Sequence, residues 1–400
     1  MAIGIPHPLR EIHTFQIPTK IMFGVNAVRK VSEEARKLTT GRRALIVTSP
    51  PLHERAFMDD VRGSLERENF EVNVLSEIEP EPGLEIAETV AKESRRAAVE
   101  IVVGVGGGSV LDMAKVASFA VTNQRDVSSY VGVNQVKKPA KPLILVPTTA
   151  GTGSEVSNVA IVSLVAEEIK SGIVSPYLYA NVAIVDPTLT ITMPPGLTAQ
   201  TGVDALSHAI EAIMSTNANP LTDALALEAI RLIANSLTTA YRQGENLDAR
   251  CDMSLAAMMA GLTIGNAGVC GAHAAAYAFA VKCKISHGIS CGIALPYVMK
   301  YNLPAIAHKL KLVARAIGES TNGSSSHESA KKAIVAVKNL NENLSIPINL
   351  KSTGLRRDVL PKLADDMLKS TRLLARQPRK IENNDALKLF EEIWEGSLEL

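Results

Sequence analysis

The chain has 400 residues, too many for one compact core, and this length predicts two domains. Its 42 basic and 41 acidic residues leave a net charge of +1, without the basic patch that nucleic-acid or anionic-membrane binding requires. No apolar run reaches the roughly 18 residues of a membrane span, the N-terminus lacks a secretory apolar core, and the four cysteines form no C-x-x-C pair. We therefore expect a cytoplasmic protein that binds neither nucleic acid nor membranes.

The first half alternates short runs rich in Val, Ile and Leu with amphipathic helical stretches. The expected strands are residues 43–49, 70–78, 98–107, 141–148 and 181–187, and the expected helices include 25–38 and 84–97. Continuous apolar runs without alternation indicate strands that are covered on both faces. The first half is thus predicted to be an α/β domain with a mostly parallel sheet.

The second half has a helical pattern. Residues 224–241 and 330–344 carry Ala, Leu and Ile at helical spacing, and strand signals disappear. The Pro-Pro-Gly sequence at 194–196 marks the boundary, so we expect an α/β domain over 1–195 and an all-helical domain over 196–400. The polar, Gly/Ser-rich residues 318–329 are expected to form a surface loop between helices.

A glycine cluster follows the expected strand 98–107 and leads into a helix. Gly106, Gly107 and Gly108 allow a ligand to approach the backbone, and Ser109 can cap the helix, where free N–H groups favour a phosphate. The cluster matches neither the G-x-G-x-x-G fingerprint nor a Walker A loop, and a tight strand-to-helix turn is the alternative interpretation.

A second loop of small residues follows the expected strand 141–148. It reads "VPTTAGTGSE" and places Thr148, Thr149, Thr152 and Ser154 among glycines. Two such loops at the carboxyl ends of parallel strands predict a nucleotide crevice, although the pattern does not distinguish a mononucleotide from a dinucleotide.

Four residues of the second half are candidate metal ligands. Asp204 and His208 are four apart in a helical stretch and share one face, as half of a divalent-metal site would. His273 and His287 bracket the apolar stretch "GAHAAAYAFAVKCKISHG" (271–288). Asp204 and His208 alone are better explained as an exposed pair, and His273 or His287 alone as a core histidine. Together, however, the four residues predict a metal site. The cysteines match no zinc-binding spacing.

The four motifs together resemble those of the iron-containing (group III) alcohol dehydrogenase family. They are "GGGSVLDMAK", "PTTAGTGSE", "GVDALSHAIEA" and "GAHAAAYAFAVKCKISHG" followed by "LPYVMKYN", in family order over almost the whole chain. The resemblance implies a fold similar to dehydroquinate synthase, with a nucleotide-binding α/β domain over 1–195, a metal-binding helical domain over 196–400 and an active site between them.

The resemblance also implies a set of site residues. Fe²⁺, with Zn²⁺ or another divalent metal as alternatives, would be held by Asp204, His208, His273 and His287. NAD or NADP would be contacted by the two loops and by a few further residues. These cofactor positions are Ser49, Gly106, Gly107, Gly108, Ser109, Asp112, Thr148, Thr149, Thr152 and Lys170.

The implied reaction is NAD(P)-linked hydride transfer that interconverts a small alcohol and its aldehyde or ketone at a metal ion. The implied assembly is a homodimer or larger homo-oligomer. A lyase or cyclase on the same scaffold, or a non-catalytic relative, are the alternatives. No Lys/Arg cluster marks a phosphate-bearing substrate, and all four candidate ligands are present, so both alternatives are disfavoured.

Two positions depart from the family pattern. Ser49 stands where the family commonly has an aspartate that would repel a 2′-phosphate, so we expect NADPH to be accepted. Tyr277 stands where many members have a histidine. Its phenol can exchange hydrogen bonds but is uncharged at neutral pH. We expect it either to serve proton transfer and the substrate oxygen as a catalytic residue or to shape the pocket wall.

Overall fold

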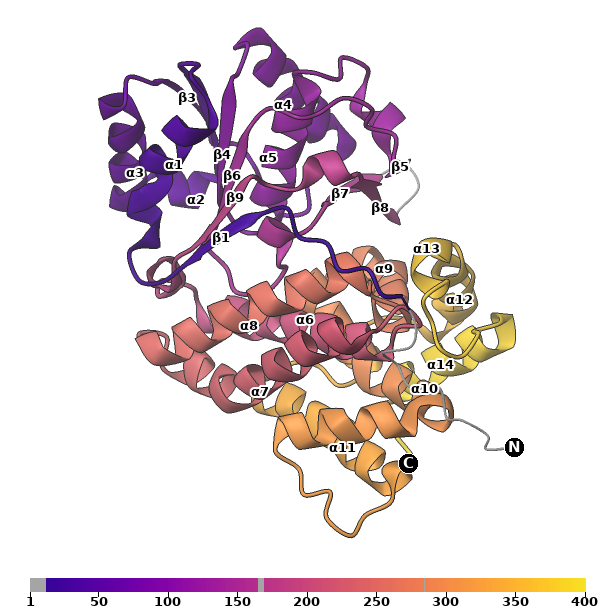
Figure 1. Ribbon diagram of the computed structural model, residues 1–400. Coiled ribbons are helices and arrows are strands. Elements are labelled where there is room, and N and C mark those ends of the chain that lie inside the picture. The colour runs from indigo at the N-terminus through magenta and orange to yellow at the C-terminus, as the bar shows by residue number, and fades with distance from the viewer. Residues whose placement is uncertain (1–11, 165–168, 284) are drawn as a thin grey trace. The chain divides into compact units, whose positions relative to one another are not determined.

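The computed structural model describes residues 12–164, 169–283 and 285–400 (Figure 1). They form two compact units. One comprises Ile17–Met193 with Glu245–Met258, and the other comprises Pro194–Gly244, Met259–Leu400 and residues 12–16. The first unit holds the sheets and the second is helical, which confirms the predicted fold class. The assignment of 1–195 and 196–400 as the two domains stays a prediction.

The first unit is built on a six-stranded parallel sheet with the strand order β1-β9-β6-β4-β2-β3. Its strands are β1 (Lys20–Phe23), β2 (Arg43–Val47), β3 (Glu71–Leu75), β4 (Ile101–Gly106), β6 (Leu143–Pro147) and β9 (Val182–Val185). Each of the five expected strand ranges contains one of them. Strand β1, at the edge of the sheet, was not predicted, because its four residues carry no long apolar run.

Alternate side chains of each strand enter two separate cores. Leu45 and Val47 pack with α4 (Leu84–Arg96) and α5 (Gly108–Ala120). Ala44 and Ile46 pack on the other face with α1 (Val31–Leu38) and α3 (Ala56–Arg67). Because helices cover both faces, the buried positions of the central strands are apolar on either side, and this explains the continuous Val/Ile/Leu runs.

A second, three-stranded sheet has the order β5-β8-β7 and was not predicted. Strands β7 (Val159–Leu164) and β8 (Ile169–Val174) are antiparallel, and the two-residue β5 (Gly132–Val133) pairs with β8 in parallel. The expected helix 25–38 is divided into a 3-10 turn, η2 (Ala27–Lys30), and α1. The other short helices of this part are α2 (Pro50–His53), η3 (Val127–Tyr130), η4 (Ser154–Val156), η6 (Pro176–Leu178) and η7 (Pro187–Thr190).

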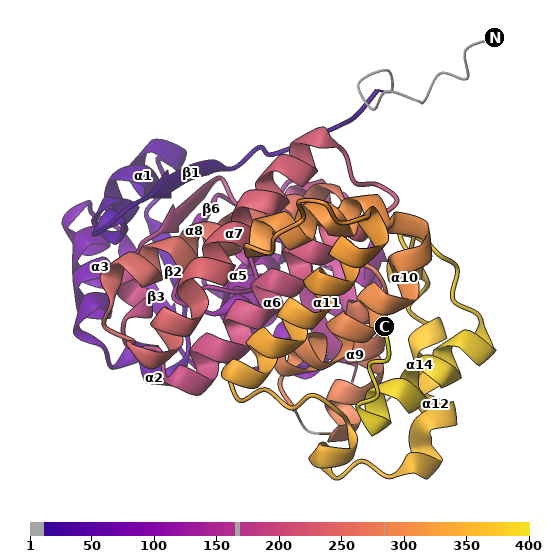
Figure 2. The ribbon, with the colours of Figure 1, turned by 90° about the horizontal axis from the view of Figure 1, so that it is seen from below.

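The chain after β9 contains only helices among the described residues. They are α6 (Pro195–Met214), α7 (Pro220–Arg242), α8 (Leu247–Asn266), α9 (Gly271–Cys283), α10 (His287–Ile317), α11 (Ser326–Asn343), η8 (Lys351–Thr353), η9 (Arg357–Val359), α12 (Leu360–Leu368), α13 (Thr371–Leu374) and α14 (Asn383–Glu395). Helix α10 packs against both α6 and α11, which Figure 2 shows from below. The expected helices 224–241 and 330–344 fall on α7 and α11.

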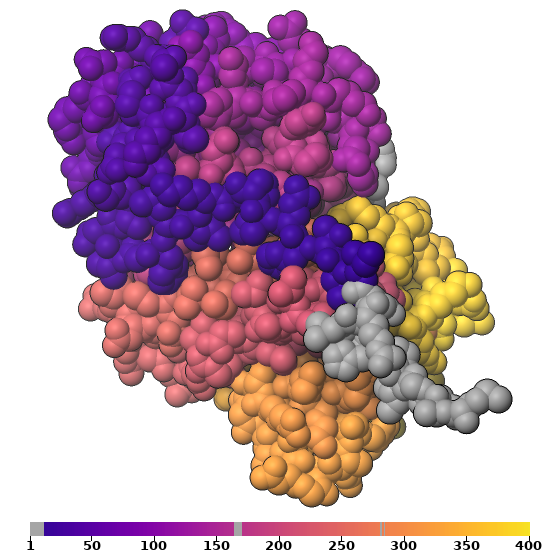
Figure 3. Space-filling view, viewed as in Figure 1, coloured from indigo at the N-terminus to yellow at the C-terminus, as the bar shows by residue number. Residues whose placement is uncertain are grey.

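The polar segment 318–329 is a loop only in its first part. Helix α10 ends at Ile317, and a capping box between Ser325 and Glu328 starts α11 at Ser326. The last residues of the predicted loop are therefore helical, because a Ser-x-x-Glu sequence satisfies the first N–H groups of a helix. The loop itself is mostly exposed and belongs to the orange surface of Figure 3.

Glycines let three helices of the second unit approach closely. A Cβ at Gly288 of α10 would lie 2.1 Å from the Gln200 carbonyl oxygen of α6, and one at Gly292 would lie 2.6 Å from Val203. A Cβ at Gly202 of α6 would lie 2.2 Å from Leu237 of α7. Since no Cβ fits at these positions, the backbone of α6 lies directly against its neighbours.

No single described helix is long and apolar enough to cross a membrane. One bent pair, Leu247–Asn266 with Gly271–Ala280, passes the same test of length and composition.

A buried ammonium group connects helix α5 to the segment that follows β6. Lys115 has no exposed surface. Its Nζ donates to Ser154 Oγ at 2.7 Å, to Ser157 Oγ at 3.2 Å and to the Val159 carbonyl at 2.6 Å, and it lies 3.5 Å from Asp112. Burial lowers the pKa of Lys115, and the Asp112 carboxylate opposes this change. These contacts satisfy the charge and hold the second loop against α5.

We predict that Lys115→Met destabilises the protein by about 3–5 kcal/mol, because it leaves the Asp112 carboxylate buried without its cation. Urea unfolding followed by far-UV circular dichroism measures the change. The control is Lys92→Met on the exposed face of α4, expected to stay within about 0.5 kcal/mol of the wild type. Equal stability of the two variants would contradict the assigned role.

Candidate functional site

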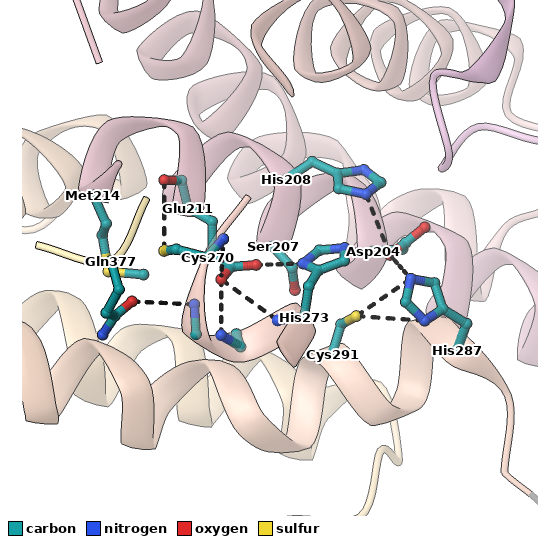
Figure 4. A network of polar contacts seen from close by, with 12 residues as sticks. Asp204, Ser207, His208, Glu211, Met214, Cys270, His273, His287, Cys291 and Gln377 are labelled. Carbon is teal, nitrogen blue, oxygen red and sulfur yellow. Dashed lines mark hydrogen bonds and ion pairs between the residues drawn. The ribbon is translucent and has the colours of Figure 1, made fainter. Parts of the chain in front are cut away.

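One face of helix α6 carries three buried polar side chains at helical spacing. Asp204, His208 and Glu211 are at positions i, i+4 and i+7, and each is 5% exposed or less. The helix begins with Pro195, whose fixed φ suits a first helical turn, and its other residues are mostly Ala, Leu and Ile. A buried face with one imidazole and two carboxylates requires partners, which α9 and α10 supply (Figure 4).

Helices α9 and α10 bring His273 and His287 to Asp204. The Asp204 Oδ1 lies 3.8 Å from His208 Nε2, 3.8 Å from His273 Nε2 and 3.6 Å from His287 Nε2. The imidazoles of His208 and His273 stack with ring centroids 4.8 Å apart. The close approach of Gly288 to α6 is what places His287, its neighbour in the chain, beside Asp204.

These separations fit a metal ion better than hydrogen bonding. They exceed the 2.7–3.2 Å of an N–H···O bond. Ligand atoms about 2.1 Å from a tetrahedral ion are about 3.4 Å apart, close to the observed spacing. The buried Nε2 of His273 also has no hydrogen-bond partner among the described residues. One carboxylate and three imidazoles are suitable donors for Fe²⁺ or Zn²⁺, so the residues present fit the implied ion.

Glu211 holds both the start of α9 and the ring of His273. Its carboxylate accepts hydrogen bonds from the backbone N–H groups of Cys270 at 3.0 Å, Ala272 at 2.7 Å and His273 at 3.4 Å. Its second oxygen contacts His273 Nδ1. Burial acts to raise the pKa of Glu211, but His273 and these hydrogen bonds outweigh it and lower the pKa. An anion at a helix N-terminus is favourable, and the contact with Nδ1 leaves Nε2 directed at Asp204.

Tyr277 lies one helical turn after His273 on α9. Its ring centroid is 5.4 Å from that of His287 and 6.4 Å from that of His273, and its side chain is partly exposed. The phenol is thus beside two of the candidate ligands. This position is compatible with either expectation, a proton-transfer role or a wall of the pocket.

The predicted cofactor loops lie at the carboxyl edge of the parallel sheet in the first unit. Strand β2 pairs with β3 on one side and with β4 on the other. The order in which successive strands are added to the sheet therefore reverses between β2 and β4. Ser49 follows β2, and Gly107 follows β4 as the N-cap of α5, which has no side-chain cap. Open α/β sheets bind nucleotides at such a switch point, and the uncapped N–H groups of α5 suit a pyrophosphate.

The second loop packs directly on the glycine cluster. A Cβ at Gly108 would lie 2.6 Å from Thr152 Cγ2, and one at Gly107 would lie 3.4 Å from Thr149 Cγ2. The Thr148 N–H donates to the Gly106 carbonyl at 3.0 Å. The two loops therefore form one continuous surface of small residues. A glycine is required at position 108 because a Cβ there would collide with Thr152 of the second loop.

Three predicted cofactor residues have partners within the protein. The prediction that Ser109 caps α5 is wrong, because Gly107 is the N-cap residue. The Ser109 hydroxyl instead accepts from the Glu81 N–H at 3.0 Å. Asp112 accepts from Ser154 Oγ at 2.6 Å and from the Ile161 N–H at 2.9 Å. Lys170 pairs with Glu81 at 2.8 Å. The Asp112 carboxylate therefore holds Ser154 and Ile161, in and after the second loop, through hydrogen bonds within the protein.

Known proteins identify the family of this chain. The family model "Iron-containing alcohol dehydrogenase" matches residues 18–187, and "Fe-containing alcohol dehydrogenase family, C-terminal" matches 198–394. The chain belongs to the iron-containing alcohol dehydrogenase family. The family binds NAD(H) and a divalent metal ion, and its chemistry supports an alcohol-linked oxidoreductase, not the lyase or cyclase alternative.

Relatives match over nearly the full length. Long-chain-alcohol dehydrogenase 1 of Geobacillus thermodenitrificans is 37% identical over 94% of this chain and 95% of its own length. A crystal structure of 1,3-propanediol oxidoreductase superposes with a TM-score of 0.92 at 35% identity, covering 96% of this chain and all of that one. Sulfoacetaldehyde reductase from Bifidobacterium kashiwanohense, solved with NAD⁺, gives 0.84 at 27% identity over 97% and 100% of the two chains.

Two residues of the centre were missed from the sequence. Glu211 follows His208 by three residues and Asp204 by seven, so helical spacing placed it on the same face. Cys291 follows His287 by four residues on α10, and its Sγ lies 3.6 Å from His287 Nε2. Zinc-type spacings between cysteines do not include this pair, because the partner of Cys291 is a histidine.

We predict that Glu211→Gln weakens Zn²⁺ or Co²⁺ binding about 10–100-fold, because an amide N–H facing Nδ1 favours the tautomer with a proton on Nε2. Competition with a chromogenic chelator measures the affinity. Glu228→Gln, on the surface of α7 beside Arg231, is the control and should bind as the wild type does. An unchanged affinity of the folded Glu211→Gln protein would contradict the role.

Proposed function

We propose that Asp204, His208, His273 and His287 hold a divalent ion, Fe²⁺ or Zn²⁺, and that the chain uses NADH or NADPH to interconvert a small alcohol and its aldehyde or ketone. The observation that carries the proposal is the buried Nε2 of His273. It has no hydrogen-bond partner among the described residues, while Glu211 holds the opposite ring nitrogen. A metal ion is the partner that this arrangement favours.

When bound, these groups would supply the chemistry that the side chains lack, namely Lewis acidity toward the alcohol or carbonyl oxygen and a nicotinamide for hydride transfer. Asp204 is the single anionic donor of the four, so the set leaves a divalent ion electrophilic. Glu211 keeps His273 in one orientation. The ring of Tyr277 lies beside the rings of His273 and His287, and we propose that its hydroxyl exchanges a proton with the substrate oxygen.

The two loops of small residues at the carboxyl edge of the parallel sheet support the assignment of the cofactor site. We propose that the N-terminus of α5, from Gly107 to Ser109, receives the pyrophosphate and that Thr148, Thr149 and Thr152 line the other side. Ser49, which follows β2 as the N-cap of α2, carries no negative charge, and this supports acceptance of the 2′-phosphate of NADPH. We extend the proposal to a cytoplasmic homo-oligomer, dimeric or larger, whose domains 1–195 and 196–400 bind the cofactor and the metal.

Anaerobic purification, metal reconstitution and an alcohol and aldehyde panel test this function. We expect turnover with Fe²⁺ or Zn²⁺ that is lost with a chelator, and comparable kcat/KM for NADPH and NADH. Ser49→Asp should lower kcat/KM for NADPH and leave that for NADH nearly unchanged. Metal-independent turnover would contradict the metal centre, and a preference of the wild type for NADH above about a hundredfold, or ~2.7 kcal/mol, would contradict the role of Ser49.

Tyr277→Phe separates the two expectations for the tyrosine. If the hydroxyl transfers a proton, the variant loses about 10²–10⁴-fold in kcat while its metal content stays the same. The pH profile of kcat under saturating substrate is the measurement. A kcat that matches the wild type across pH would show that Tyr277 is a wall of the pocket.

A further inference from the structure

Cys291 lies against the metal centre from the side of α10. It is one helical turn after His287 and is fully buried. Its Sγ is 3.6 Å from Nε2 and 3.9 Å from Nδ1 of His287 (Figure 4). The donor atoms of Asp204, His273, His287 and Cys291 all lie within 4.8 Å of one another, and His208 is not a member of that group.

We propose that the centre contains two overlapping donor sets. Asp204, His273 and His287 are common to both; His208 completes the set for a harder ion such as Fe²⁺, and Cys291 completes a second set for a thiophilic ion such as Zn²⁺, Co²⁺ or Cd²⁺. This inference rests on the metal centre of the proposed function and adds a ligand to it. Binding is not redox chemistry: the sulfur–metal bond forms as the thiol proton leaves to solvent.

The spacing of the atoms supports a sulfur ligand. A tetrahedral ion with a sulfur about 2.3 Å away and an imidazole nitrogen about 2.1 Å away separates those two atoms by about 3.6 Å. That is the distance between Cys291 Sγ and His287 Nε2. The buried Nε2 of His273, without a hydrogen-bond partner among the described residues, is directed at the same place, so the cysteine is part of a donor cluster.

The chemistry of the ligands separates the two sets. Thiolate sulfur favours Zn²⁺ and other soft ions, whereas imidazole and carboxylate also suit iron. The other cysteines do not share this position: the Cys270 N–H donates to Glu211, and Cys251 and Cys283 are outside the cluster. Cys291 is thus the residue by which this chain can alter the metal preference of the centre.

Cobalt substitution of the full-length apoprotein tests the inference. We expect stoichiometric Co²⁺ to give visible d–d bands together with an intense near-ultraviolet sulfur-to-cobalt charge-transfer band. Cys291→Ser should still bind Co²⁺ but lose the charge-transfer band. Cys283→Ser, a matched cysteine removal on α9, should keep it. His208→Ala should also keep it, because His208 is outside the sulfur set.

The outcomes separate this inference from the proposed function. Co²⁺ bound with d–d bands but without a thiol-dependent band would overturn the second donor set and leave the metal centre intact. No binding of Co²⁺ at all would contradict both. X-ray absorption of the wild-type zinc form needs no variant: a sulfur scatterer at about 2.3 Å supports the inference, and a shell of nitrogen and oxygen alone overturns it.

Discussion

The contact between Glu211 and His273 is the interaction on which the proposed metal centre depends. A carboxylate with no exposed surface is costly to bury, and here three backbone N–H groups at the start of α9 and one imidazole nitrogen satisfy it. The same contact fixes where α9 begins and which nitrogen of His273 faces Asp204. Secondary structure and site chemistry are therefore determined together by one side chain of α6.

Close backbone packing provides the second constraint. The glycine at 288 removes the Cβ that would strike the Gln200 carbonyl, and His287 is the residue next to it. A larger residue there would move α10 away from α6 and carry His287 with it. Small residues in the "HGISCG" segment are thus a geometric requirement of the centre. In the other unit, buried Lys115 has a comparable role, since it ties the Ser154 loop to the helix whose N-terminus is proposed to bind phosphate.

Sequence patterns predicted five of the six strands of the parallel sheet and the candidate pair Asp204 and His208 because each of these signals is local. A strand covered on both faces is apolar throughout, and residues four apart on a helix share a face. Contacts between distant segments left no such signal. The ion pair of Lys170 with Glu81, and the Ser109 hydroxyl that accepts from Glu81, join residues far apart in the chain. Strand β5 has only two residues, and β8 mixes Lys and Ser with apolar residues, so neither has a clear strand pattern. Strand β7 is a mostly apolar run and was missed although it has the pattern of a strand.

The position of the metal in the loaded protein tests the proposed centre most directly. An anomalous difference map from crystals grown with Fe²⁺ or Zn²⁺ locates the ion without reference to activity. We expect a single strong peak about 2.0–2.3 Å from ligand atoms of Asp204, His273 and His287, the three donors that both ligand sets share. A peak elsewhere in the chain, or no peak beside Asp204 in protein shown to contain the metal, would contradict it.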